Sequence, residues 1–346
     1  FGQEALGSNT TGGSNTAVGY AALYGNTTAS NNVAVGKNAL LSNTTGAQNV
    51  AVGAIALDAN TTGAGNTAMG YGALSAVTTE GNNTAIGRNT LLVNTGADNT
   101  AVGSAALTAN TTGTLNTAVG YISLDANTTG NYNTGLGYGA LSANTTAANN
   151  TGVGANALYV STTGTDNTAV GKSALTANTT ASNNTAVGSS ALAANTTGDE
   201  NVAIGYLALD ASTTVSDNTA VGTRALSANT TGVANTAIGF DAGKAITTGE
   251  RNAILGYQAA EATTTGSHIT ALGYYALGAN TTGGYNTAVG SKVLQANTTG
   301  IGNTAMGYGA LDANTTTNYN VAIGQDALGV NTAADNVAIG VNALSA

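Results

Sequence analysis

The 346-residue chain contains no cysteine, proline or tryptophan, and it has only two phenylalanines, two methionines and one histidine. Without cysteine it can form neither disulfides nor thiolate metal sites. Charged residues make up 7% of the chain, against roughly 25% in an ordinary soluble domain, so we do not expect a globular enzyme. Its few Lys and Arg do not cluster, which argues against nucleic-acid binding. No apolar run reaches the roughly 18 residues of a membrane-spanning helix, so no membrane insertion is predicted.

Glycine, by contrast, contributes 49 residues, and much of it recurs at a fixed interval. The chain consists of twenty copies of a unit of 17 residues, Asn-Thr-Ala-Val-Gly-Tyr-x-Ala-Leu-x-Ala-Asn-Thr-Thr-Gly-x-x, numbered here as positions 1 to 17. The first copy opens at Asn15. Position 5 is Gly in all copies, and position 9 is Leu in all except Gly243 and Ala260. This regularity predicts a single repetitive domain over residues 1–346, a segment of a longer fibre.

The residue types of the unit favour strands over helices. Thr-Ala-Val is rich in β-branched residues, a Gly inside a helix would cost about 1 kcal/mol per copy, and turn-forming residues fill the remainder. We predict an all-β fold, a parallel β-solenoid of twenty coils, each with two short strands, Thr-Ala-Val and Ala-Leu. The Asn residues at positions 1 and 12 are expected to form hydrogen-bonded ladders between coils.

Side chains alternate along a strand, so one face of Thr-Ala-Val must point into the coil. We predict that Thr16 and Val18 point inward and that Ala17 points outward. Because this outward position is almost always Ala or Gly, another chain should pack closely against it. A lone rod that buries about two large aliphatic side chains per coil is marginal, so a side-by-side homotrimer is expected. The predicted inter-chain packing residues include Ala17, Ala34, Ala51, Ala68, Ala118, Ala169 and Ala203.

Positions 1 to 5 resemble the Asn-Ser-Val-Ala-Ile-Gly signature of head repeats in trimeric autotransporter adhesins. Residues 201–205, 320–324 and 336–340 each read Asn-Val-Ala-Ile-Gly and come closest to it. The repeats also look like those of phage tail fibres. The resemblance covers the whole chain, although the unit here is longer by its Asn-Thr-Thr-Gly insertion. It implies a left-handed parallel β-roll in which three chains lie side by side and serve surface attachment.

Several residues could carry a function on the surface of such a rod. Tyrosines at position 6, among them Tyr20, Tyr71, Tyr121 and Tyr138, form either a surface-binding row that stacks on sugars or ordinary packing between coils or chains. Asn-Thr-Thr matches the glycosylation sequon, but its periodicity favours a loop ladder. His268 lacks Cys or carboxylate neighbours at ligand spacing, and the carboxylates are dispersed. No catalytic, cofactor or metal site is therefore predicted.

These features predict a non-catalytic structural or adhesive fibre that is extracellular, at the cell surface or on a virion. Its expected partner is itself, as a homotrimer or end-to-end filament, with a host surface or glycan as a further candidate. A phage tail-fibre shaft is one alternative, and a polysaccharide-binding rod based on the Tyr row is another. Ice binding by regular Thr rows is a third, against which the predicted inward orientation of Thr16 argues. The least regular stretch, residues 239–277, has three interpretations, a local bulge, a contact patch or sequence drift, of which drift is favoured.

Overall fold

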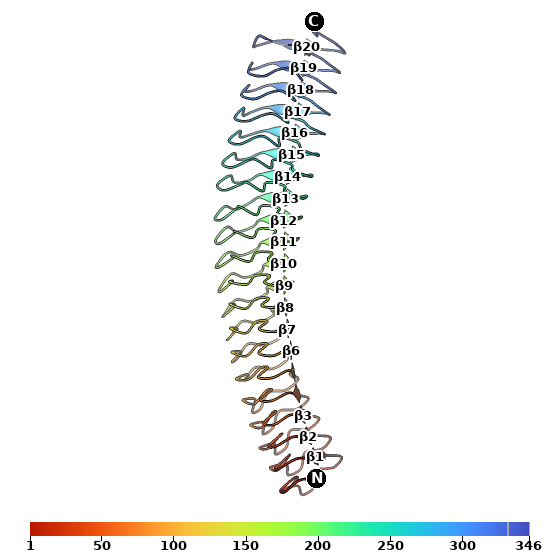
Figure 1. Cartoon of the computed structure of the whole chain (residues 1–346), viewed down its shortest axis with the longest axis vertical. Coiled ribbons are helices and arrows are strands. Elements are labelled where there is room, and N and C mark those ends of the chain that lie inside the picture. Colours follow the sequence, from red (N-terminus) through yellow and green to blue (C-terminus); the bar gives the residue numbers. More distant parts are fainter. Residues whose placement is uncertain (331, 346) are drawn as a thin grey trace. The chain divides into compact units, whose positions relative to one another are not determined.

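The structure, a computed structural model that describes residues 1–330 and 332–345, winds each repeat into one coil. The chain divides into two units, residues 1–168 and 169–346. Within each unit, the strands follow one another along one side of the stacked coils (Figure 1). The described residues form short strands and turns and contain no helix, so the prediction of an all-β parallel solenoid is confirmed.

Every strand has three residues and occupies positions 2 to 4 of its repeat. The strands of the first unit are β1 (Thr16–Val18), β2 (Val33–Val35), β3 (Val50–Val52), β4 (Thr67–Met69), β5 (Thr84–Ile86), β6 (Thr100–Val102), β7 (Thr117–Val119), β8 (Thr134–Leu136) and β9 (Thr151–Val153). The boundary between the units falls within β10 (Thr168–Val170). The second unit continues with β11 (Thr185–Val187), β12 (Val202–Ile204), β13 (Thr219–Val221), β14 (Thr236–Ile238), β15 (Ala253–Leu255), β16 (Thr270–Leu272), β17 (Thr287–Val289), β18 (Thr304–Met306), β19 (Val321–Ile323) and β20 (Val337–Ile339).

Neighbouring strands within a unit pair in parallel and in register, so that equivalent positions stack on each other. Ala17 of β1, for example, lies opposite Ala34 of β2. One repeat in the first unit is a residue shorter than the others, yet Ala85 of β5 still lies opposite Ala101 of β6. The missing residue is absorbed by the connecting turn, as a loop position allows.

Each coil in the described residues contains one strand, so the prediction of a second strand at Ala-Leu was wrong. The reason is the backbone of Leu at position 9, which is left-handed, with φ of 55° at Leu23 and 52° at Leu40. An extended strand requires negative φ. In this turn Leu40 is fully buried, and its N–H donates to the carbonyl of Ala56 in the next coil at 3.0 Å. Hydrogen bonds between coils therefore continue through the turn without a strand.

The predicted assignment of the strand faces was also wrong, because the structure inverts it. Ala34 at position 3 is 0% exposed, whereas Val18 at position 4 is 39% exposed. The interior already holds Leu, Ala and two Asn per coil, which leaves little room beneath the strand. A Cβ placed on Gly152, which replaces Ala at position 3, would already lie 3.3 Å from Leu141 Cγ. The predicted inter-chain packing residues Ala17, Ala34, Ala51, Ala68, Ala118, Ala169 and Ala203 are instead core residues of a single chain.

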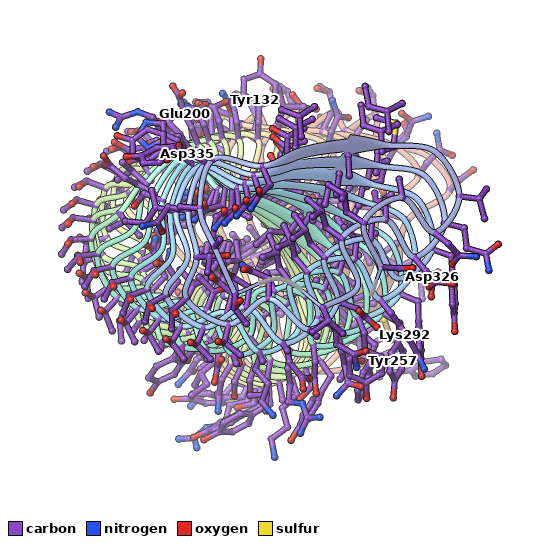
Figure 2. All side chains as sticks on the ribbon, turned by 90° about the horizontal axis from the view of Figure 1, so that it is seen from above. Tyr132, Glu200, Tyr257, Lys292, Asp326 and Asp335 are labelled. Carbon is purple, nitrogen blue, oxygen red and sulfur yellow. The ribbon has the colours of Figure 1, made fainter. Side chains whose placement is uncertain are left out.

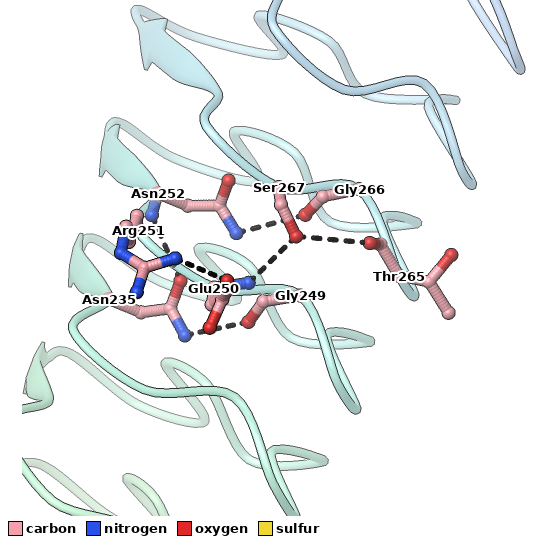
Figure 3. Close-up of polar contacts among 8 residues, drawn as sticks. All are labelled: Asn235, Gly249, Glu250, Arg251, Asn252, Thr265, Gly266 and Ser267. Atoms are coloured by element: carbon pink, nitrogen blue, oxygen red, sulfur yellow. Dashed lines mark hydrogen bonds and ion pairs between the residues drawn. The ribbon is translucent and has the colours of Figure 1, made fainter.

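The position 1 Asn residues form the first of two ladders through the interior. The backbone N–H of Asn49 donates to Asn32 Oδ1 at 2.9 Å, and Asn49 Nδ2 donates to the carbonyl of Gly63 at 2.8 Å. Figure 3 shows the same pattern in the second unit, where Asn252 N–H donates to Asn235 Oδ1 at 3.0 Å. Each amide thus joins two coils and closes its own loop.

The position 12 Asn residues form the second ladder. Asn43 Nδ2 donates to Asn26 Oδ1 at 3.0 Å and to the carbonyl of Gly46 at 2.9 Å, and Asn60 Nδ2 donates to Asn43 Oδ1 at 2.8 Å. These three Asn are fully buried. The predicted Asn ladders are confirmed, and these Asn of the Asn-Thr-Thr sequence are interior residues. The ladder stops where Val77 takes position 12, so Asn60 Oδ1 is buried without a hydrogen-bond partner.

Candidate binding surfaces

The outer side of the strands, which we call the strand face, consists of the side chains at positions 2 and 4. Position 4 is Val, Ile, Leu or Met in all twenty repeats, and its side chains are partly exposed, for example Met69 at 41% and Leu136 at 42%. Neither position carries a charged residue in any repeat. Within each unit these side chains form an apolar surface that runs from coil to coil, and surfaces of this kind are uncommon on monomeric proteins and mark sites of interaction.

Position 2 contributes a row of Thr to the strand face. It is Thr in fourteen of the twenty repeats, Val in five and Ala253 in one. Thr16 is exposed and the equivalent Thr67 is partly exposed. The prediction that Thr16 points inward was therefore wrong, because Thr16 lies on the same side of the strand as Val18 and opposite to Ala17.

The tyrosines at position 6 lie on the surface but do not form a continuous row. Tyr20, Tyr71, Tyr121 and Tyr138 are all exposed. Tyr121 and Tyr138 belong to neighbouring coils, and their rings stack with centroids 6.0 Å apart. Tyr20 and Tyr71 are separated by two coils that carry Lys37 and Ala54 at this position.

A larger aromatic cluster, which sequence analysis did not single out, lies in the second unit. At position 6, Phe240 stacks on Tyr257 with centroids 5.2 Å apart, and Tyr257 stacks on Tyr274 at 5.6 Å. Tyr275 at position 7 meets Tyr257 and Tyr274 edge-on, at 6.0 Å and 4.6 Å. Figure 2 shows Tyr257 on the same side of this unit as Lys292 and Asp326, away from Glu200 and Asp335. Aromatic residues at position 6 in three successive repeats were the signal available in the sequence.

An ion-pair network holds one end of this cluster. Arg224 lies over the ring of Phe240, 5.2 Å from its centroid, and its Nε and Nη2 each donate to a carboxylate oxygen of Asp241 at 2.8 Å. Lys244 Nζ lies 3.7 Å from Asp241 Oδ2. The side chain of Asp241 is only 3% exposed, so both ion pairs lie at a buried carboxylate. The network holds Arg224 against Phe240, the first of the three stacked rings at position 6.

Several core residues in the coils of this cluster also differ from the usual residues of the repeat. Gly243 replaces the position 9 Leu, and a Cβ placed on it would lie 3.0 Å from the Cδ1 atoms of Ile246 and Ile254. Ile246 replaces a ladder Asn, Ile254 replaces a position 3 Ala, and Ala260 replaces the next Leu. All four of these residues are buried. The replacements compensate one another in volume, which independent sequence drift does not produce.

An open hollow of about 330 Å³ lies beside Tyr275. Its lining residues are Glu261, Ala262, Tyr275, Gly278, Ala279 and Gln295. Desolvation raises the pKa of Tyr275, and the negative charges that Tyr274 and Glu261 can carry raise this pKa further. The Tyr275 hydroxyl is therefore protonated at neutral pH and can donate a hydrogen bond.

His268, for which no ligand role was predicted, lies at position 17 in the loop, where its ring stacks on Tyr285 with centroids 4.8 Å apart. Over residues 1–330 and 332–345, no group of three or more His, Cys, Asp or Glu is placed to hold a metal ion. The same residues contain no helix that is long and apolar enough to cross a membrane. No family model, curated protein or solved structure matches this chain.

Proposed function

We propose that the chain is the shaft of a non-catalytic structural or adhesive fibre, in which copies of the chain lie side by side and touch through the strand face. The observation that carries this proposal is the exposed, uncharged position 4 row, which is aliphatic in every repeat. Because equivalent positions stack in register within each unit, a contact made by one coil can be repeated by the next. The interface proposed from the sequence thus moves from position 3 to positions 2 and 4.

A trimer remains the assembly that we favour. The strand face has two different rows, Thr or Val at position 2 and larger aliphatic residues at position 4. The position 4 row of one copy can pack against the position 2 row of the next, which is a head-to-tail contact that closes into a ring. Three copies around an axis parallel to the strand stack would shield every strand face from water. Such a shaft suits a cell-surface adhesin or a phage tail fibre equally well.

The test is the mass of the full chain by sedimentation equilibrium at physiological salt. We expect the mass of three chains. A variant with Val102→Lys, Val119→Lys and Leu136→Lys places three like charges on the strand faces of successive coils. It should sediment as a monomer, because burying unpaired ammonium groups is costly.

The matched control introduces the same charges in the same three coils but on the loop. Thr112→Lys, Thr129→Lys and Thr146→Lys change exposed residues at position 14. This control should keep the mass of the parent chain. The proposal is wrong if the parent is a stable monomer, or if both triple variants dissociate alike.

Ice binding is the second candidate function, and one observation now favours it. The Thr row at position 2 lies on the outer side of the parallel sheet, which removes the objection raised from the sequence. The two candidates exclude each other, because a strand face buried in a trimer cannot contact ice. Thermal hysteresis that is shown by a monomeric parent and lost on Thr100→Lys, Thr117→Lys and Thr134→Lys would replace the fibre proposal with this one.

A further inference from the structure

The hollow in the second unit exists because one residue in the row of stacked position 10 residues has no side chain. Glu261, Gly278 and Gln295 occupy position 10 of three successive repeats, so the carboxylate and the amide flank the place where Gly278 has no side chain. Other repeats place bulky residues there, such as Leu41 and Leu92. The result is an opening of about 330 Å³ on the surface.

One wall of the hollow is an aromatic ring held in a fixed orientation. Tyr275 meets Tyr274 at an interplanar angle of 84° and Tyr257 at 64°. Those two rings continue the column to Phe240, whose outer face is covered by Arg224. A ring that is immobilised in this way before binding loses little conformational entropy when a ligand arrives.

We infer that this hollow binds one ring of a neutral saccharide. A sugar ring has an apolar face of C–H groups and an edge of hydroxyl groups. The Tyr275 ring suits the apolar face, the Glu261 carboxylate can accept hydrogen bonds from hydroxyls, and the Gln295 amide can both donate and accept them. Most ligand pockets enclose about 300 to 1,000 Å³, so this hollow has the size for a single small ring.

The charges of the lining residues select the class of ligand. They include no Lys or Arg, and Glu261 would repel a carboxylated or sulfated sugar, so a neutral saccharide fits best. A quaternary ammonium ligand could pair with the Glu261 carboxylate, but such ligands are usually enclosed by several aromatic rings. Tyr275 is the one aromatic residue among the lining residues of this hollow. Because the hollow is open to solvent and its flanking residues run along the stack, a longer chain can continue past the bound ring. The site would give the proposed fibre an adhesive contact, but it does not require self-association.

The experiment is an array of neutral oligosaccharides built from glucose, galactose, mannose and N-acetylhexosamines, probed with the full chain. The best-bound saccharide is then titrated by calorimetry against three variants. Gly278→Leu fills the hollow with a residue that other repeats tolerate, and Tyr275→Asn removes the ring while keeping a residue suited to φ of 53°. Each should weaken binding at least about tenfold, the effect of an interaction of roughly 1.4 kcal/mol. Glu261→Gln should weaken it less, because the amide still accepts a hydrogen bond.

The control variant is Ser227→Leu, which places the same Leu at position 10 in another repeat of the second unit. It should bind like the parent chain. Circular dichroism of every variant must match that of the parent, so that lost binding is not lost folding. The inference is overturned if no neutral saccharide binds, if Gly278→Leu and Ser227→Leu bind equally, or if choline binds and Glu261→Gln abolishes that binding. The sedimentation result for the trimer is independent of each of these outcomes.

Discussion

The interior Asn ladder makes a quantitative prediction, because two of its members differ by a known number of hydrogen bonds. Asn43 Nδ2 donates to Asn26 Oδ1 and Gly46 O, and Asn43 Oδ1 accepts from Asn60 Nδ2. Asn60 Nδ2 donates equivalently, to Asn43 Oδ1 and Gly63 O, but Asn60 Oδ1 has no partner. Both residues are fully buried, and truncation to Ala removes the same atoms from each.

Asn43→Ala leaves Asn26 Oδ1 without a partner and deprives Asn60 Nδ2 of one of its two acceptors. Asn60→Ala leaves Asn43 Oδ1 without its hydrogen-bond donor, but it also removes Asn60 Oδ1, which already had no partner. A buried polar group without a partner costs about 1–3 kcal/mol. We therefore expect Asn43→Ala to destabilise its coils by about 2 kcal/mol more than Asn60→Ala.

Native-state hydrogen exchange is the suitable assay, because a stack of coils can open locally without unfolding completely. The amides of residues 40–66 should lose roughly thirtyfold more protection in Asn43→Ala than in Asn60→Ala, since about 1.4 kcal/mol corresponds to a factor of ten. Equal losses, or a larger loss in Asn60→Ala, would refute the view that these amides stabilise the stack through bonds between coils.

Three further predictions concern the backbone and the buried charges. Leu115 has φ of 58° and is 45% exposed, so Leu115→Asn should raise the free energy of unfolding by about 0.5–1 kcal/mol in urea titrations, because Asn tolerates the left-handed region. Gly120 has φ of 135°, and a Cβ there would lie 2.4 Å from the Gly137 carbonyl oxygen. Gly120→Ala should therefore lower the urea midpoint by an amount equivalent to at least about 2 kcal/mol, and an unchanged midpoint would contradict the close approach of the coils. Burial raises the pKa of Asp58 and of Asp210, which outweighs the backbone hydrogen bonds that lower it. At these two carboxyls the folded state binds protons more tightly than the unfolded state. Their contribution to stability is therefore fully present below the unfolded pKa of about 3.9 and is lost as pH rises through the raised folded pKa. The double variant Asp58→Asn, Asp210→Asn should reduce the dependence of the urea midpoint on pH between acid and neutral pH. An unchanged pH dependence would exclude these two carboxyls as its source.

The period of the repeat was sufficient to predict the solenoid, because the spacing is a property of the sequence itself. Gly at position 5 and Leu at position 9 recur at the same interval, and parallel pairing in register is the simplest way to stack them. The Asn ladders follow from the same stacking, since equivalent amides come to lie one coil apart.

The orientation of the strand could not be predicted in this way. Alternation separates Ala17 from Thr16 and Val18 but does not say which set is inside. That choice depends on the volume left in the coil, which is set by a Leu with positive φ at position 9. Leu seldom adopts this conformation, so its propensity indicates a strand where the chain forms a turn.

The aromatic cluster and the hollow were predictable in part. Phe240, Tyr257 and Tyr274 stand at position 6 of three successive repeats, so their stacking follows from the register. The hollow is harder to anticipate, because it depends on the absence of a side chain at Gly278 between two long polar neighbours. Such a gap becomes visible only when equivalent positions are compared between adjacent coils.

The orientation of the strand is the central claim, and the absence of native cysteine allows a direct test. Ala68→Cys and Met69→Cys place single thiols on neighbouring residues that are 0% and 41% exposed in the parent chain. In the Val102→Lys, Val119→Lys and Leu136→Lys background, which should be monomeric, the Met69→Cys thiol should react with a maleimide, whereas the Ala68→Cys thiol should not. A rapidly reacting Ala68→Cys thiol together with an inert Met69→Cys thiol would contradict this orientation of the strand.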